Sequence, residues 1–219
     1  RKHFEDAAGK YIKEFKLSPR KSYVIDIGSN DGTLLDIAEK KGMEVWGVEP
    51  SDALKDAPLN IKEKTVNMFF GSSKCEHFFQ KKKVKFDVIT AISMFYDVSE
   101  PLKFIEKARD LLTPDGNILI EVNYAKSFFE RQNIDMLGQE HLIYYFIETF
   151  SDLISKANLF INDAYLTDMN GGNITFTISR MDKKNRKYLS LANKEKSWME
   201  TFNFESFEEI VRKGFYKSN

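Results

Sequence analysis

The feature that most constrains the fold is an apolar run that ends in an acid and a glycine. Residues 22–28 are Ser-Tyr-Val-Ile-Asp-Ile-Gly, and a helical pattern over residues 33–41 follows them. A short, continuous apolar run is typical of a strand that is buried on both faces. A glycine at its end lets the backbone pass close to a ligand, because it has no Cβ atom to collide. The sequence therefore predicts a buried strand, a tight turn beside a ligand and a helix.

The same alternation of strand and helix continues along the chain. Further strands are predicted over residues 44–48, 86–92 and 117–122, with a weaker one within 60–66 and a turn at 113–116. Helices are predicted over residues 2–16, 102–112 and 148–158. This alternation indicates parallel βαβ units. The last two predicted strands, 160–167 and 173–179, are joined by a short turn and must pair antiparallel. We therefore expect an α/β, Rossmann-like fold, with a mostly parallel seven-stranded sheet that ends in an antiparallel hairpin strand.

Composition narrows the kind of partner. Lys and Arg number 33 and so do Asp and Glu, which gives a net charge of +0 and no electrostatic case for nucleic acid or an anionic membrane. No apolar run approaches the ~20 residues that span a bilayer. The chain has one cysteine and three histidines, which supply no tetrahedral ligand set for a metal. We expect a cytoplasmic protein without a metal that acts on a small molecule, with further residues upstream of Arg1.

The turn after the first strand carries a recognisable pattern. Asp26, Gly28 and Gly32 stand in the order Asp-x-Gly-x-x-x-Gly, which resembles motif I of the methyltransferases that use S-adenosylmethionine (SAM). Asn30 occupies the position of the middle glycine of dinucleotide binders, and SAM has no pyrophosphate to cradle. Glu49 follows about 20 residues later, a spacing that places a carboxylate on ribose hydroxyls. The alternative is a tight turn and a surface acid, but the combination favours the class I SAM methyltransferase fold.

Two further segments are expected to line the cofactor pocket, because ligands of open α/β sheets bind beyond the carboxyl ends of the strands. Asn67 is expected at the adenine amino group and Ser93 beneath the methionine portion, whereas Met94 fits core packing equally well. The predicted cofactor residues are Asp26, Gly28, Ser29, Asn30, Gly32, Glu49, Pro50, Asn67, Met68 and Ser93.

The chain also resembles one family, the sugar C-methyltransferases that methylate C3 of nucleotide-linked deoxysugars. The resemblance rests on residues 26–35, 47–51, 121–124, 135–142 and 170–173. It implies a nucleotide-linked keto-deoxysugar as substrate, Tyr124, Asn170 and Gly171 as substrate-binding residues, and His141 and Glu140 as the catalytic pair. Gly138 and Gln139 depart from the family pattern, as does Asn170, so the substrate stays open.

The chemistry of the residues agrees with a catalytic histidine. A carbon becomes nucleophilic only after it loses a proton, and a carbonyl group acidifies the carbon next to it. Histidine is the side chain best suited to remove that proton near neutral pH. We therefore predict His141 as the base that forms an enolate, with Glu140 orienting it or binding substrate. The alternative for His141 is a structural histidine on a loop.

Three interpretations of the function remain open. The first is C-methylation of a nucleotide sugar, and the second is O- or N-methylation of a small molecule on the same fold. The third is a SAM-binding module without catalysis. We expect residues 1–180 to form the methyltransferase domain, and residues 181–219 to form a helical extension or the start of a further domain.

Overall fold

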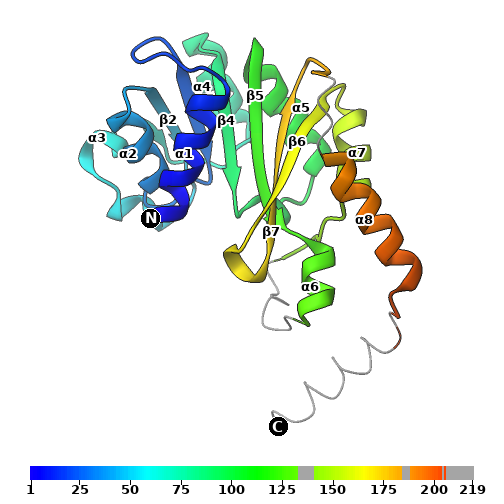
Figure 1. Cartoon of the computed structure of the whole chain (residues 1–219). Helices are drawn as coiled ribbons and strands as arrows, with labels where there is room; N and C mark the ends of the chain where they lie inside the picture. Colours follow the sequence, from blue (N-terminus) through cyan, green and yellow to red (C-terminus); the bar gives the residue numbers. More distant parts are fainter. Residues whose placement is uncertain (133–140, 184–187, 204, 206–219) are drawn as a thin grey trace.

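The computed structural model describes residues 1–132, 141–183, 188–203 and 205. Its centre is a sheet in the order β3-β2-β1-β4-β5-β7-β6 (Figure 1). The strands are β1 Tyr23–Ile27, β2 Glu44–Val48, β3 Thr65–Val66, β4 Phe86–Ile92, β5 Leu112–Asn123, β6 Phe160–Thr167 and β7 Asn173–Ser179. The first five run parallel, and β7 lies antiparallel between β5 and β6. The predicted α/β, Rossmann-like fold with its terminal hairpin is confirmed.

Helices cover both faces of the sheet. Helices α1 Lys2–Glu14, α2 Thr33–Lys40 and α3 Leu59–Lys62 share one buried cluster with β1 and β2. Helices α4 Ser73–Lys82, α5 Pro101–Leu111 and α7 Ile147–Lys156 share the other. Helix α6 Ala125–Arg131, helix α8 Tyr188–Thr201 and the short 3-10 turns η1 Asp52–Asp56, η2 Phe95–Asp97 and η4 Met169–Gly171 complete the described part. None of the helices in these ranges is long and apolar enough to cross a membrane.

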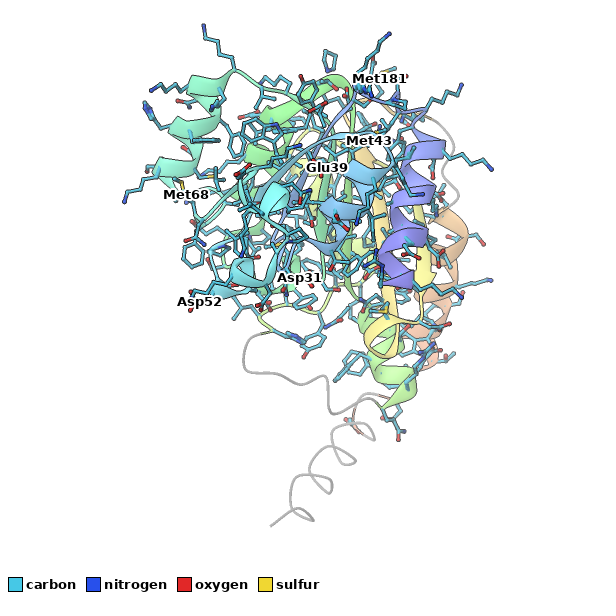
Figure 2. The ribbon with its side chains drawn as sticks, turned by 90° about the vertical axis from the view of Figure 1, so that its left-hand side faces the viewer. Asp31, Glu39, Met43, Asp52, Met68 and Met181 are labelled. Carbon is cyan, nitrogen blue, oxygen red and sulfur yellow. The ribbon has the colours of Figure 1, made fainter. Side chains whose placement is uncertain are left out.

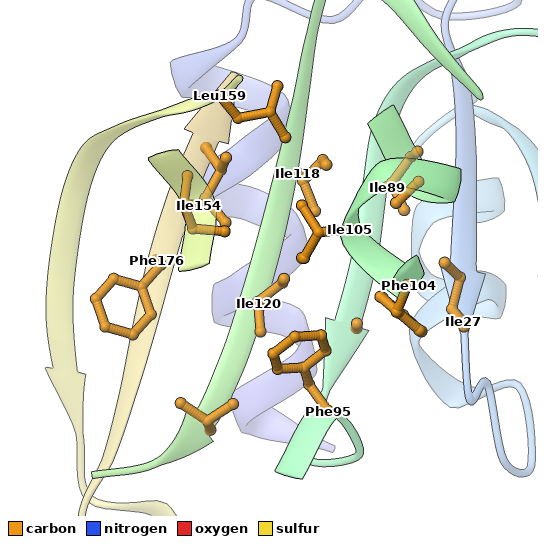
Figure 3. Packing of buried hydrophobic residues seen from close by; sticks show 14 of the residues in the cluster. Ile27, Ile89, Phe95, Phe104, Ile105, Ile118, Ile120, Ile154, Leu159 and Phe176 are labelled. Carbon is orange, nitrogen blue, oxygen red and sulfur yellow. The ribbon is translucent and has the colours of Figure 1, made fainter. Parts of the chain in front are cut away.

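The larger core lies between the sheet and α5 and α7 (Figure 3). Phe150 of α7 stacks on Phe176 of β7 with ring centroids 4.0 Å apart, and Phe95 packs edge-on against Phe104 of α5. Buried aromatic pairs of this kind add about 0.5–1.5 kcal/mol to the area that they remove from water. Two-sided burial explains why the parallel strands are continuous apolar runs in the sequence.

Two predicted elements differ in the structure. The predicted turn at 113–116 lies within β5, because Leu112 pairs with Phe86 and Asn117 pairs with Val88, so that the intervening residues form an irregular bulge. Gly116 permits this, since a Cβ atom there would lie 2.8 Å from the Phe86 carbonyl oxygen. The weak strand predicted within 60–66 is confirmed only over 65–66, because residues 60–62 belong to α3 and a turn follows them.

The parallel strands bring distant loops to one edge. Figure 2 shows Asp31 and Asp52, which follow β1 and β2, below Met43 and Met181. Met43 precedes β2 and lies at the opposite edge with Met181. The start of α1, α6 and the connection between β6 and β7 also lie at the lower, carboxyl edge (Figure 1). This edge is therefore where a ligand site is expected.

Helix α8 packs against β6 and α7 through a buried acid. The Glu195 carboxylate accepts the backbone N–H of Ile147 at 3.0 and 2.9 Å and that of Glu148 at 3.3 Å. These N–H groups begin α7 and have no partner within their own helix. A carboxylate at a helix N-terminus also interacts favourably with the helix dipole. Glu195 thus connects α8 to the domain core.

We expect Glu195→Ala to lower the free energy of unfolding by about 1–3 kcal/mol, because buried N–H groups at the start of α7 lose their acceptor. The matched control is Glu200→Ala, an exposed position on the same helix, which should change stability little. Urea unfolding of both variants measures the difference. Equal stability of the two variants would contradict this role for Glu195.

Candidate cofactor cleft and acceptor site

A cleft of about 1000 Å³ opens at the carboxyl ends of β1, β2 and β4. It brings together seven of the predicted cofactor residues, namely Asp26, Gly28, Ser29, Asn30, Glu49, Pro50 and Ser93. Phe69 also lines the cleft, with 73% of its surface exposed. The start of α1 reaches the cleft through Arg1 and Phe4. The cleft therefore joins polar groups from the strand ends with aromatic groups that can pack on a planar ligand.

Glu49 joins the loops that follow β1 and β2. One carboxylate oxygen accepts the backbone N–H of Asn30 at 2.7 Å, and the other accepts that of Ser51, also at 2.7 Å. Asn30 adopts a left-handed conformation with φ of 51°, which turns its N–H toward Glu49. Each carboxylate oxygen keeps a further lone pair. The buried Glu49 is thereby fixed in position and can still accept hydroxyl groups from a ligand.

The turn at Gly28 allows close approach of the backbone to the cleft. Gly28 has φ of +74°, and a Cβ atom there would lie 2.9 Å from Met94 Cγ. Met94 itself lines the cleft directly beneath this turn. Any side chain at Gly28 would therefore strain the backbone and displace the cleft wall.

Asp26 is buried under the same turn. Its carboxylate accepts a hydrogen bond of 2.6 Å from the Thr90 hydroxyl of β4. Burial raises the pKa of Asp26 to about 7, and the nearby Glu49 charge adds to the rise, whereas the Thr90 hydrogen bond opposes it. An acid with this pKa changes its charge close to neutral pH.

Three predicted cofactor residues lie outside the lining of the cleft. Gly32 precedes α2, where a Cβ atom would lie 2.5 Å from Ile61 Cγ2, so its glycine serves the packing of α3. Asn67 Nδ2 donates to the backbone carbonyl oxygen of Glu49 at 2.8 Å and supports the loop from behind. Met68 packs against the larger core cluster. Their contacts with neighbouring protein groups explain these residues without a ligand.

His141 lies at the end of β5, beside η2. Its Nδ1 is 3.3 Å from Asn123 Nδ2, and its ring packs edge-on against Tyr96 at 4.4 Å. The backbone N–H groups of the next two residues, Leu142 and Ile143, donate to the Tyr96 carbonyl oxygen at 3.0 and 3.2 Å. These contacts fix the segment that carries the imidazole. Its predicted companion Glu140 lies outside the described residues.

The other predicted substrate residues lie near α6. Burial raises the pKa of Tyr124, and so does the Glu195 carboxylate, with which the Tyr124 hydroxyl forms a hydrogen bond. The Tyr124 backbone N–H donates to the Gly172 carbonyl oxygen at 3.3 Å. Gly171 ends η4 beside this contact, and the side chain of Asn170 lies outside the described part of the chain.

A buried acid at the end of β5 also belongs to this edge and was not among the predicted site residues. Glu121 accepts hydrogen bonds from Asn173 Nδ2 at 3.1 Å, the Thr175 hydroxyl at 3.0 Å and the Ser93 hydroxyl at 3.4 Å. His3 of α1 places Nε2 3.1 Å from one Glu121 oxygen and 3.2 Å from the other. The sequence does contain a signal for this acid, because Glu121 stands inside the apolar run 117–122. A buried carboxylate there needs polar partners from other parts of the chain.

The residues fit a methionine-derived nucleoside at this edge. Ser29 Oγ is buried in the cleft wall and has no hydrogen-bond partner among the described residues. A buried hydroxyl without a partner costs free energy that a bound ligand recovers. The glycine turn would allow the backbone to approach such a ligand closely, and Glu49 could accept its ribose hydroxyls.

The sheet order and this cleft define the class as a Rossmann-like α/β domain of the kind that binds SAM. A family model described as a methyltransferase domain matches residues 1–164, so the chain belongs to the family of methyltransferase domains. SAM is the methyl donor of this domain.

Two curated proteins show where the sequence similarity lies. The ubiquinone biosynthesis O-methyltransferase of Histophilus somni is 30% identical over 138 residues, which cover 61% of this chain and 57% of that protein. The C-methyltransferase NovU of Streptomyces niveus is 23% identical over 151 residues, or 69% of this chain and 36% of that protein. The chain thus spans just over half of the first relative's length and about a third of the second's.

Solved structures share the fold at low sequence identity. Magnesium protoporphyrin IX methyltransferase from Synechocystis PCC 6803, with bound S-adenosylhomocysteine (SAH), has a TM-score of 0.62 at 12% identity, covering 82% of each chain. The plantazolicin methyltransferase BpumL, in complex with SAH and a pentazolic analogue, has a TM-score of 0.61 at 16% identity, covering 82% of this chain and 84% of that one.

We expect Glu49→Gln to weaken SAH binding about 10- to 100-fold. The glutamine side chain lacks the negative charge that ribose hydroxyls would meet. Its NH₂ group also faces the N–H of Asn30 or Ser51, so that one hydrogen bond within the loop is lost. Hydrogen bonds to charged groups contribute about 1.5–3 kcal/mol. Asp52→Asn, at an exposed acid beside the same loop, is the control. Calorimetric titration with SAH measures both, and an unchanged affinity for Glu49→Gln would contradict the assignment.

We expect Asp26→Asn to alter how stability depends on pH. The unfolded carboxyl ionises near pH 4 and the folded one near pH 7, so the wild-type chain loses stability as the pH rises between these values and then levels off. The amide still accepts from Thr90, so the variant should gain stability relative to the wild type over that range, by up to roughly 4 kcal/mol. Urea unfolding from pH 4 to 8, with exposed Asp31→Asn as control, measures the gain. Parallel profiles for wild type and Asp26→Asn would refute it.

Proposed function

We propose that the chain is the catalytic domain of a SAM-dependent enzyme that methylates a carbon of a nucleotide-linked keto-deoxysugar. The observation that carries the proposal is the position of His141, held against Asn123 and Tyr96 at the carboxyl end of β5. This end adjoins the cofactor cleft through Ser93, which follows β4. The similarity to a C-methyltransferase over 69% of the chain supports a carbon acceptor.

In this proposal the cofactor occupies the cleft at the ends of β1, β2 and β4. Glu49 accepts the ribose hydroxyls, Gly28 and Ser29 lie against the methionine portion, and Asn30, Pro50 and Ser93 complete the walls. Asp26 supports the turn from below, while Gly32, Asn67 and Met68 act by shaping the loops that carry these groups. SAM supplies a methyl group on a positively charged sulfur.

His141 acts as the base in the acceptor site. A neutral imidazole carries its hydrogen on one of its two nitrogens. Whether the amide oxygen or the amide nitrogen of Asn123 faces Nδ1 determines which nitrogen of His141 that is. With Asn123 Oδ1 turned toward Nδ1–H, Nε2 becomes the basic nitrogen. It removes a proton from the carbon next to the sugar carbonyl group, and the electron pair moves to the carbonyl oxygen. The enolate carbon then bonds to the methyl group while the carbonyl forms again.

The remaining assignments concern the sugar side and the domain limits. We propose that Glu140 assists His141, that Asn170 and Gly171 border the sugar, and that Tyr124 contributes by fixing the backbone at Gly172. Residues 1–180 form the methyltransferase domain in this proposal. Residues 181–219 form a helical extension or the start of a further domain; of these, α8 is connected to the domain by Glu195, and residues 184–187, 204 and 206–219 lie outside the described residues.

The second candidate is methylation of an oxygen on a small molecule. It is favoured by the 30% identity with a ubiquinone biosynthesis O-methyltransferase. A histidine base serves an acceptor hydroxyl as well as a carbon acid. The two candidates differ in one property, because only C-methylation requires a carbon-bound proton of the substrate to exchange or leave.

We expect His141→Gln to lower the rate of methyl transfer ~10²–10⁴-fold, the usual contribution of a general base, and to change SAH affinity little. The matched control is His77→Gln, an exposed histidine on α4. The assay uses the full-length protein, SAM with a ¹³C-labelled methyl group and a thymidine diphosphate 4-keto-6-deoxyhexose, whose C3 adjoins the carbonyl. Carbon NMR identifies the atom that carries the label. A label on oxygen would contradict the C-methylation proposal, and full activity of His141→Gln would contradict the base.

A further inference from the structure

The face of β5 that looks toward α1 carries a row of polar groups. Glu121 and Asn123 are two residues apart on the strand and therefore point to the same face. Leu119, at the preceding position of that face, packs with α1 and α2. On the neighbouring strand, Thr175 and Asn173 stand opposite Glu121 and Asn123. The row lies at the carboxyl edge, next to the cofactor cleft.

Each end of this row holds an imidazole. His3, from α1, contacts both oxygens of Glu121, and His141 contacts Asn123. Two residues along a strand span about 7 Å, so the two residues that hold the rings are neighbours on one face of β5. The sequence separation of 118 residues between His3 and Glu121 shows that the fold alone creates this arrangement.

Glu121 fixes the orientation of His3. An ionised carboxylate only accepts hydrogen bonds, so the Nε2 atom of His3 that faces it must carry the hydrogen. The Ser93 hydroxyl donates to one of the two Glu121 oxygens, Oε1, and Ser93 is part of the cleft wall. The neighbouring residues Arg1 and Phe4 also line the cleft. His3 keeps 19% of its side chain exposed, whereas Glu121 keeps 2%, so the imidazole is the accessible member of the pair.

Stability alone accounts poorly for such a pair. Glu121 already accepts from Asn173, Thr175 and Ser93, and a buried acid paired with a histidine is weak evidence for stabilisation. A buried carboxylate that holds a partly exposed imidazole beside a ligand cleft is instead a common arrangement for acid–base chemistry.

We propose that His3, oriented by Glu121, is a second catalytic histidine, which binds the carbonyl oxygen of the acceptor. The inference rests on the proposed enolate chemistry. His141 takes the proton from the carbon, and the electron pair moves to the carbonyl oxygen. His3 acts here in its imidazolium form, in which both ring nitrogens carry hydrogen: Nε2–H stays on Glu121, and Nδ1–H donates to the carbonyl oxygen. When the new carbon–carbon bond forms, the pair leaves the oxygen to restore the carbonyl, and the electrons of the broken sulfur–carbon bond stay on sulfur to give SAH. Glu121 acts through His3 and is a positioning residue.

The test separates enolate formation from methyl transfer. Full-length protein is incubated in deuterated water with SAH and the thymidine diphosphate 4-keto-6-deoxyhexose, and NMR follows exchange of the proton at C3. We expect His3→Gln to slow exchange ~10²-fold, because removal of one hydrogen-bond donor to a developing oxyanion typically lowers the rate by about that factor. His77→Gln and the exposed Asp6→Asn on α1 should exchange at the wild-type rate. The SAH affinity of these three variants should stay within about threefold of the wild-type value. A tenfold change, which corresponds to about 1.4 kcal/mol, would show that the substitution disturbs the cofactor cleft.

A second variant tests the link between the two residues. Glu121→Gln should slow exchange by a similar factor, and the double variant should be little slower than either single one, because both remove one functional unit. Wild-type exchange in His3→Gln, with or without a change in melting temperature, would overturn the role of His3. Additive effects in the double variant would overturn the positioning by Glu121. Absence of exchange in the wild type, with methyl transfer to oxygen, would instead overturn the proposed function on which this inference rests.

Discussion

The parallel arrangement of β1, β2, β4 and β5 is the constraint on which the site depends. Because these strands run in one direction, the residues that follow them meet at one edge of the sheet. Gly28, Glu49, Ser93 and Glu121 come from four different strand ends and lie around one cleft and its adjoining polar row. The helices on both faces keep the strands buried, and the cleft opens at the edge where the strands end.

Three buried acids concentrate negative charge at this edge. Asp26, Glu49 and Glu121 each accept hydrogen bonds from fixed groups, which offsets part of the cost of removing a carboxylate from water. The raised pKa of Asp26 shows that the compensation is incomplete, since burial and the charge of Glu49 both act against its ionisation. A positively charged sulfonium bound nearby would lower this cost. The edge is thus electrostatically prepared for a cationic cofactor.

The sequence predicted those elements that local pattern determines. The strands over 86–92, 160–167 and 173–179 agree with the predicted bounds, because apolar runs and turn residues mark them without help from distant parts. The bulge at 113–116 was missed, since its shape depends on the register with β4. In the site, Glu49 and the glycine turn follow from spacing within one βαβ unit. The contacts of Glu121 with His3 and of Tyr124 with Glu195 depend on segments far along the chain, and no local pattern announces them.

The location of the cofactor is the central claim, and hydrogen–deuterium exchange of the backbone tests it most directly. Addition of saturating SAH should protect amides within residues 27–34, 48–52 and 92–95, the segments that carry the cleft-lining residues at the strand ends. The structure also has a hollow of about 730 Å³ between α4 and α5, lined by Phe79, Lys85 and Lys107 among others. Peptides from that region should exchange at unchanged rates. Protection confined to residues 75–85 and 105–111, with none at the strand ends, would contradict the account.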